Sequence, residues 1–329
     1  MADGVAPPSE VLALGPPIIL RTKYEKQLSE KFRVLKPWES PLPLQQFLRT
    51  HARNTRALIC SGAFKYLGAE TLDLLPSLRL VVTSSAGLDH IDLQECRRRD
   101  IAVAYAGTIF SADVADMAVG LLIDVLRKIG AADRFVKSGL WPVQPVDESY
   151  PLATKLSHKR VGIVGLGSIG QEVAKRLEAF DCKISYQSRT KKCSVSYPFY
   201  DGVRELAANC DILVVCCALN DQTYHLINKE VLEALGKQGV IINIARGPVI
   251  DEKELVQFLQ EGRIAGAGLD VFEDEPNVPS ELCGLDNVVL SPHYAALTEE
   301  SFREMYELIV SNLEAFFSDQ PLISPVVLK

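Results

Sequence analysis

The chain has 329 residues, which is enough for about two domains of ordinary size. Hydrophobic residues make up 47% and charged residues 23%, the balance of a globular protein rather than of a disordered or fibrous one. The net charge of −7 and the lack of a long apolar run argue against nucleic-acid binding and membrane insertion, so we expect neither partner.

The stretch 1–17 contains four prolines and no signal-peptide or transit-peptide pattern, and it is predicted to be a loose extension. Eight cysteines are scattered along the whole chain without a C-x-x-C pair or a nearby histidine at metal-ligand spacing, so we expect no metal site. These features predict a protein of a reducing compartment, the cytoplasm.

In the first hundred residues, short apolar runs alternate with amphipathic stretches. The runs predict strands and the stretches predict helices, which together indicate a parallel sheet with flanking helices. Strands are expected at 17–20, 57–60 and 80–83, and helices at 24–31 and at 69–75, the latter ending before Pro76.

A long helix is expected next, from residue 111 to about 138, because its apolar residues repeat at helical spacing. Its apolar face must be covered, either by its own domain or by another subunit. From residue 160 the β/α alternation is stronger, with strands expected at 161–164, 183–186, 212–216, 240–244, 267–270 and 288–290.

The predicted fold is therefore α/β, with two Rossmann-like domains, each a parallel sheet flanked by helices, and an active site in the cleft between them. Residues 1–106 are expected to form a substrate-binding domain and 107–298 a dinucleotide-binding domain. A last helix at 298–317 is expected to pack back on the first domain, which the segment 299–329 would complete.

A dinucleotide fingerprint lies between the strand at 161–164 and a predicted helix at 171–180. Its glycines allow a tight turn and close approach of backbone N–H groups to a pyrophosphate at the positive end of the helix dipole. The cofactor-binding residues expected here are Gly165, Leu166, Gly167, Ser168, Ile169 and Gly170.

The residues after the second strand of this domain indicate which nicotinamide cofactor binds. An NAD enzyme normally has Asp or Glu at this point, whereas here the position is occupied by Ser188, followed by Arg189 and Thr190. A hydroxyl and a guanidinium suit a 2′-phosphate, and Lys191 or Lys192 adds positive charge. We therefore expect NADPH, with NADH also possible.

Three motifs follow at the carboxyl ends of predicted strands, at 243–247, 270–276 and 291–293. Hydride addition to a ketone builds negative charge on oxygen, so it needs a proton donor and a cation for a substrate carboxylate. His293 is the expected donor, Glu275 would hold its tautomer and favour its protonated form, and Arg246 offers a planar fork of donors. The predicted reaction is reduction of a 2-oxo acid.

The motifs GLGSIG at 165–170, NIARG at 243–247, GLDVFEDEP at 268–276 and SPH at 291–293 resemble the D-isomer-specific 2-hydroxyacid dehydrogenases. The resemblance covers nearly the whole chain beyond the N-terminal extension. It is strongest to plant glyoxylate/hydroxypyruvate reductases and hydroxyphenylpyruvate reductases.

That resemblance implies catalytic roles for Arg246, Glu275 and His293, with Arg246 also binding substrate, and a homodimer formed through the long helix. It also implies that backbone N–H groups at Ser85, Ala86 and Gly87 bind the substrate carboxylate. Leu219 and Ala245 would line the cofactor cleft, together with Arg246 and His293, and Asp270 would lie near the nicotinamide carboxamide.

Two substrate classes stay open at this point: small 2-oxo acids such as glyoxylate and hydroxypyruvate, and the aromatic 4-hydroxyphenylpyruvate. Phe64 or Tyr66 could narrow the substrate pocket or stack on a ring. Trp141 resembles a residue that some family members lend to a neighbouring active site, or it is an anchor of the core or of an interface. An alternative of another class is a nucleotide-sensing scaffold of the corepressor type.

Overall fold

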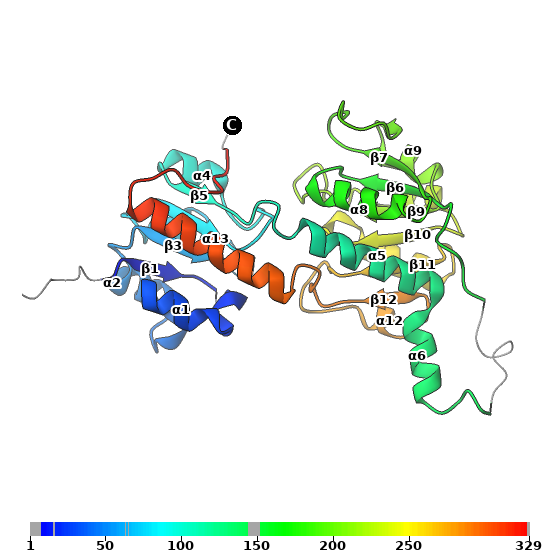
Figure 1. Ribbon diagram of the computed structural model, residues 1–329, viewed down its shortest axis with the longest axis horizontal. Helices are drawn as coiled ribbons and strands as arrows, with labels where there is room; N and C mark the ends of the chain where they lie inside the picture. The colour runs from blue at the N-terminus through cyan, green and yellow to red at the C-terminus, as the bar shows by residue number, and fades with distance from the viewer. Residues whose placement is uncertain (1–7, 16, 63, 65, 144–151, 328–329) are drawn as a thin grey trace, which may run out of the picture. The chain divides into compact units, whose positions relative to one another are not determined.

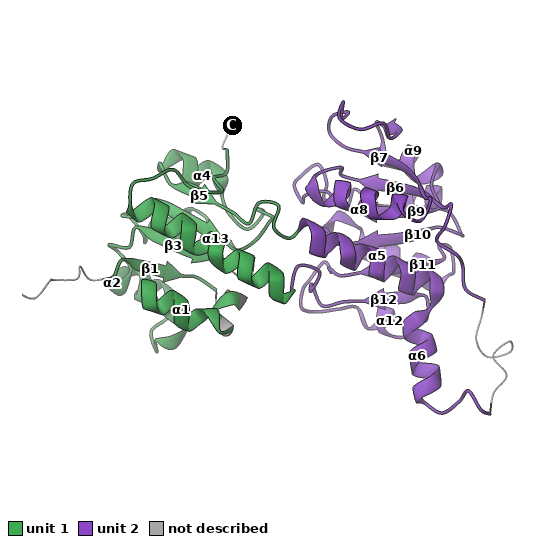
Figure 2. Ribbon diagram, in the orientation of Figure 1, with its two compact units in different colours: residues 1–110, 298–329 green, residues 111–297 purple. Residues whose placement is uncertain are grey.

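In the computed structural model, the described residues are 8–15, 17–62, 64, 66–143 and 152–327. They form two compact units, unit 1 from Met1–Phe110 with Thr298–Lys329 and unit 2 from Ser111–Leu297 (Figure 2). Unit 2 is thus inserted into the sequence of unit 1. The domain boundaries expected after residues 106 and 298 lie close to these junctions.

Unit 1 is built on a five-stranded parallel sheet in the order β2-β1-β3-β4-β5 (Figure 1). The three central strands are buried almost throughout, which explains their continuous apolar sequences. The strands are β1 (Glu10–Ala13), β2 (Arg33–Leu35), β3 (Ala57–Cys60), β4 (Leu80–Thr83) and β5 (Ala102–Ala104).

The helices of unit 1 cover this sheet, and α13, the last helix of the chain, packs against β4 as expected. Thr298 caps α13 by accepting a hydrogen bond from the Ser301 N–H group. The helices are α1 (Tyr24–Lys31), α2 (Leu44–His51), α3 (Ala69–Leu72), α4 (Leu93–Arg98) and α13 (Glu299–Phe317), with short 3₁₀ turns at Ile18–Arg21 and Pro37–Glu39.

The segment after α13 returns to the edge of this sheet. The side chain of Asn312, fully buried in α13, accepts hydrogen bonds from the N–H groups of Ile323 and Ser324. Beyond it, the Val326 N–H group donates to the Val103 carbonyl at 2.7 Å, beside β5. The final residues described therefore complete unit 1.

Unit 2 is built on a seven-stranded parallel sheet in the order β12-β11-β10-β9-β6-β7-β8. The strand order reverses between β6 and β9, and ligands of open α/β sheets bind at the carboxyl ends of the strands beside such a switch point. The strands are β6 (Arg160–Val164), β7 (Lys183–Gln187), β8 (Phe199–Tyr200), β9 (Ile212–Val215), β10 (Val240–Asn243), β11 (Gly266–Leu269) and β12 (Val288–Leu290).

Helices flank both faces of this sheet, and α5 and α8 pack against each other on the face turned to the viewer in Figure 1. Two glycines of β11 let α5 approach: a Cβ atom at Gly268 would lie 3.0 Å from the Leu121 Cβ atom, and one at Gly266 would lie 2.9 Å from Val125 Cγ1. The helices are α5 (Ser111–Arg127), α6 (Ile129–Lys137), α8 (Ser168–Glu178), α9 (Val203–Ala208), α10 (Lys229–Leu235), α11 (Glu252–Gln260) and α12 (Ser280–Cys283).

The two-sheet α/β prediction is confirmed, but three of its elements are wrong. The run at 17–20 is not a strand: residues Ile18–Arg21 form a 3₁₀ turn, which Leu20 closes by donating to the Pro17 carbonyl. The strand lies earlier, at β1, inside the stretch predicted to be a loose extension, of which residues 1–7 and 16 lie outside the described part. Pro17 lacks the N–H group that a central strand needs.

The single helix expected over 111–138 is also wrong, because α5 and α6 are separated at Lys128, whose backbone is left-handed (φ +57°). The Asp124 carboxylate stabilises the break by accepting a hydrogen bond from the Gly130 N–H group at 2.7 Å. Likewise, the helix expected at 69–75 ends at Leu72 and continues as turns.

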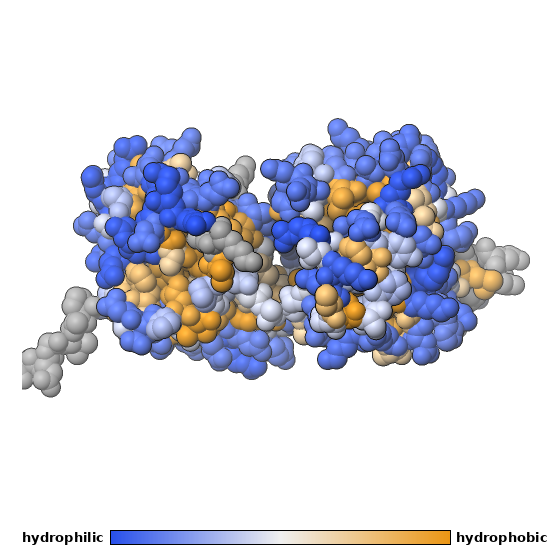
Figure 3. Space-filling model, turned by 90° about the horizontal axis from the view of Figure 1, so that it is seen from above, coloured by the Kyte–Doolittle hydropathy of each residue, from blue (hydrophilic) through white to orange (hydrophobic). Residues whose placement is uncertain are grey.

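Hydrophilic residues make up most of the face of each unit seen in Figure 3, with smaller apolar areas between them. Among the helices of the described residues, none is long and apolar enough to cross a membrane.

Candidate active site

The glycine-rich loop between β6 and α8 has the geometry of a phosphate cradle. A Cβ atom at Gly165 (φ +92°) would lie 2.7 Å from the Cys217 backbone, and one at Gly170 would lie 2.3 Å from the Gly165 carbonyl oxygen. Gly167, the N-cap of α8, has open space around its Cα atom and offers no side-chain cap to the first-turn N–H groups. The loop therefore suits an anion at the helix N-terminus.

The loop after β7 is basic, and a buried tyrosine of that strand binds its backbone. The hydroxyl of Tyr186, which is fully buried, accepts a hydrogen bond from the Lys192 N–H group at 2.8 Å. The Ser188 hydroxyl donates to the Thr190 carbonyl at 2.7 Å, and Arg189 is exposed between them. These contacts shape a short cationic turn without a carboxylate at the end of the strand.

The turn after β10 carries Arg246 and is shaped by a buried amide. Asn243 donates from Nδ2 to the Arg246 carbonyl at 3.0 Å and accepts at Oδ1 from the Ala245 N–H group at 3.1 Å. One guanidinium nitrogen of Arg246 donates to the Ala245 carbonyl at 2.8 Å. The backbone of Arg246 and one nitrogen of its guanidinium are thus fixed locally.

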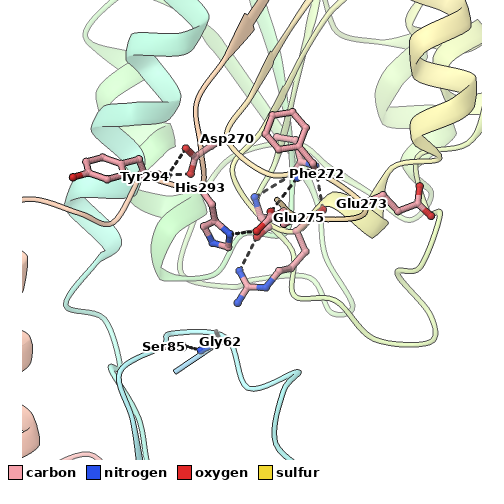
Figure 4. Close-up of polar contacts among 12 residues, drawn as sticks. Gly62, Ser85, Asp270, Phe272, Glu273, Glu275, His293 and Tyr294 are labelled. Atoms are coloured by element: carbon pink, nitrogen blue, oxygen red, sulfur yellow. Dashed lines mark hydrogen bonds and ion pairs between the residues drawn. The ribbon is translucent and has the colours of Figure 1, made fainter. Parts of the chain in front are cut away.

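The buried carboxylate of Asp270, at the end of β11, holds the loop that carries His293 (Figure 4). Its two oxygens accept hydrogen bonds from the N–H groups of Tyr294 at 2.8 Å and Ala295 at 3.0 Å. The His293 N–H group donates to the Asp270 carbonyl at 2.7 Å, and His293 has a left-handed backbone (φ +55°). Asp270 therefore fixes this unusual conformation of His293.

Glu275 and His293 form a close pair, with 2.7 Å between Oε2 and Nδ1 (Figure 4). The other carboxylate oxygen accepts from the Phe272 N–H group at 3.1 Å. Partial burial acts to raise the pKa of Glu275, but the bond to His293, the Phe272 N–H group and the nearby Arg246 outweigh it, so the pKa lies below its ordinary value. The carboxylate thus stays ionised and holds the imidazole by its Nδ1 atom. The Nε2 atom is the ring nitrogen turned away from Glu275.

In unit 1, the loop that follows β4 contains the residues expected to bind a substrate carboxylate. The Ser85 hydroxyl accepts from the Gly62 N–H group at 2.9 Å (Figure 4), and the Ser85 N–H group donates to the Thr83 hydroxyl at 3.3 Å. The Ser85 N–H group is therefore engaged within the protein. Among the described residues, the N–H groups of Ala86 and Gly87 have no such acceptor.

The NAD binding domain of the D-isomer specific 2-hydroxyacid dehydrogenases matches residues 119–295, more than half of the chain. The chain belongs to this family. Its members are oxidoreductases, and the glycine-rich cradle and the His–Glu pair both lie within the matched region, so the chain is an enzyme that uses a nicotinamide cofactor on a small 2-oxo or 2-hydroxy acid.

Individual relatives cover the whole chain. It is 52% identical over 329 residues to the glyoxylate/hydroxypyruvate reductase HPR3 of Arabidopsis thaliana, covering 100% of both chains. It is 48% identical to the hydroxyphenylpyruvate reductase of Plectranthus scutellarioides, covering 94% of this chain and 96% of that one. A solved NADPH-dependent glyoxylate/hydroxypyruvate reductase from Sinorhizobium meliloti, in complex with NADP and malonate, matches with a TM-score of 0.88 and 33% identity over 97% of both chains.

The residues predicted from the family motifs fall into two groups in the structure. Arg246, Asp270, Glu275 and His293 come from adjacent loops at the carboxyl ends of β10, β11 and β12. Ala245, the residue before Arg246, belongs to the apolar core of unit 2, and Leu219, in the loop after β9, packs against that core. Trp141 is 60% exposed.

Sequence reasoning gave no role to three residues that hold these loops. Tyr186 is an apolar-looking strand residue whose hydroxyl supports the basic loop. His225 and Glu273 form a second His–Glu pair, with 3.0 Å between Nε2 and Oε1. The two partners are 48 positions apart in the sequence, so their pairing could not be predicted from it. The one hint in the sequence is that Glu273 lies two residues before Glu275.

Proposed function

We propose that the enzyme reduces glyoxylate or hydroxypyruvate to the D-2-hydroxy acid with NADPH. The His293–Glu275 pair beside Arg246, on a unit that carries the glycine-rich cradle, is the observation that supports this reaction most directly. The relative that is 52% identical over the full chain is named for these two substrates.

The side chains suit each requirement of ketone reduction. NADPH, when bound at the cradle, supplies the hydride. The His293 Nε2 atom donates a proton to the substrate carbonyl oxygen, while the Glu275 carboxylate stabilises the imidazolium before transfer. The Arg246 guanidinium binds the substrate carboxylate. In unit 1, the N–H groups of Ala86 and Gly87 are donors that suit a carboxylate.

The proton-donor role can be tested by steady-state kinetics. His293→Ala should lower kcat for glyoxylate by about 10² to 10⁴-fold, the usual contribution of a positioned acid. Glu275→Gln should lower kcat less, because the imidazole remains but loses its ionic partner. Near-normal turnover by His293→Ala would remove His293 from this role, and no turnover of any 2-oxo acid by the parent enzyme would favour the scaffold function instead.

For the cofactor, we propose NADPH over NADH because the loop at 188–192 presents Ser188 and Arg189 where a ribose-binding carboxylate would repel a phosphate. The parent enzyme should show a higher kcat/KM with NADPH. Arg189→Ala should erode that preference without changing kcat/KM for NADH, whereas the same change at exposed Arg303 on α13 should do nothing. Equal use of both cofactors by the parent enzyme would contradict the proposal.

A second substrate, 4-hydroxyphenylpyruvate, is favoured by the 48% identical relative and by Tyr66, which is 53% exposed in the loop expected to face the substrate side chain. Phe64, by contrast, packs against the core of unit 1. Comparing kcat/KM for glyoxylate, hydroxypyruvate, 4-hydroxyphenylpyruvate and pyruvate decides between the classes. If the aromatic acid is preferred, Tyr66→Ala should reduce that preference.

We also propose a homodimer formed through α5 and α6. No residue of α6 is buried within the chain, and Ile129 and Val136 are 53% and 51% exposed. Sedimentation should show a dimer that Ile129→Asp with Val136→Asp converts to a monomer. A monomeric parent protein would rule the proposal out.

The cytoplasm is the compartment we propose, since all eight cysteines are free thiols in the structure. A fluorescent fusion imaged in cells would test it, and accumulation in any organelle would contradict it.

A further inference from the structure

A second histidine–carboxylate cluster includes Glu273, on the loop that carries Glu275. The His225 imidazole has its Nε2 atom 3.0 Å from Glu273 Oε1 and its Nδ1 atom 3.7 Å from Asp251 Oδ2. Because an ionised carboxylate can only accept a hydrogen bond, the Nε2 atom must donate to Glu273. The Tyr224 ring stacks on the imidazole at a centroid distance of 4.0 Å and fixes its plane.

The backbone around His225 is tied to the segment that carries Arg246. The His225 N–H group donates to the Pro248 carbonyl at 2.8 Å, and the Ile227 N–H group donates to the Val249 carbonyl at 3.0 Å. His225 itself has a left-handed backbone (φ +49°). The main chain of His225 therefore follows the Arg246 segment, while its side chain reaches the loop at 272–275.

These two loops also touch directly. A Cβ atom at Gly247 would lie 1.9 Å from the carbonyl carbon of Phe272, so the backbones are in close contact there. Glu273 is held on its other side as well, because its N–H group donates to the Glu252 carboxylate at 3.1 Å. Glu273 points away from Glu275 (Figure 4), so the two carboxylates are fixed by different partners.

We propose that His225 is a positioning residue for the proton donor, an inference that rests on the proposed function. By holding Glu273, His225 fixes the loop at the position two residues before Glu275 and so keeps the Glu275 carboxylate in reach of the His293 Nδ1 atom. Through its backbone it keeps the Arg246 segment in register with that loop. His225 thus acts on His293 indirectly, through the loop that carries Glu273 and Glu275. Of the two histidines, only His293 contacts the substrate.

The test uses two substitutions that separate the nitrogens of the imidazole. An Asn side chain can place its amide near the Nδ1 position only, whereas the longer Gln side chain can reach the Nε2 position and donate to Glu273. Asn also adopts left-handed backbone readily, so His225→Asn removes the bond to Glu273 without adding backbone strain. His158→Asn, at an exposed histidine with φ +67°, is the matched control.

We expect His225→Asn to lower kcat for glyoxylate about tenfold with KM for NADPH unchanged. Its alkaline limb in the pH profile of kcat should move to lower pH, because a misplaced Glu275 no longer favours the protonated imidazole. His225→Gln should retain the parent limb, and His158→Asn should match the parent in both respects. A purely structural role would lower Tm but leave the limb in place.

An unshifted limb and normal kcat in His225→Asn would overturn the inference. If that variant fails to fold, Glu273→Ala serves instead and should give the same shift, and an unshifted limb there would overturn it equally. His293→Ala measured in parallel distinguishes the two proposals: its normal turnover would refute the proposed donor, whatever the His225 variants do.

Discussion

At the scale of single residues, the loops of the candidate active site are packed so closely that adding one atom would displace them. Gly247 leaves no room for a Cβ atom beside the Phe272 backbone, and backbone atoms cannot move aside as the end of a flexible side chain can. The contact lies between Gly247, the residue after Arg246, and the loop that carries Glu275.

Gly247→Ala should therefore force the two loops apart. We expect a loss of stability of about 1–3 kcal/mol, the usual cost of overpacking, and a fall in kcat of at least about tenfold. Gly202→Ala is the control, because a Cβ atom there meets nothing within 4 Å and its φ of −113° suits any residue. Equal Tm and kcat in the two variants would contradict the argument.

The Tyr186 hydroxyl gives a second prediction at this scale. Tyr186→Phe removes only the oxygen that accepts from the Lys192 N–H group, so the ring packing against Phe199 is retained. A lost neutral hydrogen bond costs roughly 0.5–1.5 kcal/mol, or about two- to tenfold in KM. KM for NADPH should rise by that factor while KM for NADH stays constant, and Tyr200→Phe should change neither. A parallel rise in both KM values would show a general loss of folding instead.

The residues to which we assign the chemistry are predicted from sequence, since Arg246, Glu275 and His293 each follow a recognisable strand in a short motif, and the structure brings Glu275 and His293 into contact. The residues that support them could not. His225 and Glu273 are brought together only by the fold, and a tyrosine in a buried strand gives no sign that its hydroxyl has a partner.

At the scale of elements, α4 shows how a short helix is stabilised by charge. Glu95 accepts hydrogen bonds from Arg98 and Arg99, and Arg99 also pairs with Asp73. The bonds from the Arg98 and then the Arg99 side chains lower the pKa of Glu95 from 4.5 to about 2. The run of three arginines in the sequence is therefore partly neutralised within its own unit.

This shift predicts a pH dependence of stability. A carboxyl whose pKa is lower in the folded state stabilises the protein fully above its unfolded pKa and loses that contribution as pH falls through the folded value. Glu95→Gln should thus lower Tm at pH 7, and its difference from the parent should shrink as pH falls below 4.5 toward 2. The same change at exposed Glu70 is the control for removing one surface charge. A constant difference for Glu95→Gln would refute the assignment.

Most strands of the sheets could be predicted because they are buried on both faces and so read as continuous apolar runs. The exceptions have local causes. The 3₁₀ turn at Ile18–Arg21 contains the same residue types as a strand, and only Pro17 distinguishes it. The break between α5 and α6 depends on the left-handed Lys128 and on the Asp124 carboxylate, neither of which interrupts the apolar periodicity.

At the scale of the whole molecule, each unit has its own buried core, and only unit 2 carries the glycine-rich cradle. A ligand that binds the native state alone stabilises it by about 2.7 kcal/mol at one hundred times its Kd. Saturating NADP⁺ should therefore slow amide hydrogen exchange in β6 and α8 most, with smaller changes in β1 and β3. Mass spectrometry would measure this, and equal protection of both units would contradict a site based on the cradle.

The insertion of unit 2 also sets the order in which the two units can finish folding during synthesis on the ribosome. β1 to β5 emerge first, but the helix that packs on β4 and the segment beside β5 follow only after roughly 190 further residues. At about 5–20 residues per second, the sheet of unit 1 waits on the order of ten to forty seconds with part of its apolar surface uncovered. Unit 2 is continuous and needs no such delay, so the nascent chain completes its nucleotide-binding unit first. The apolar surface of unit 1 is prone to aggregation during that interval.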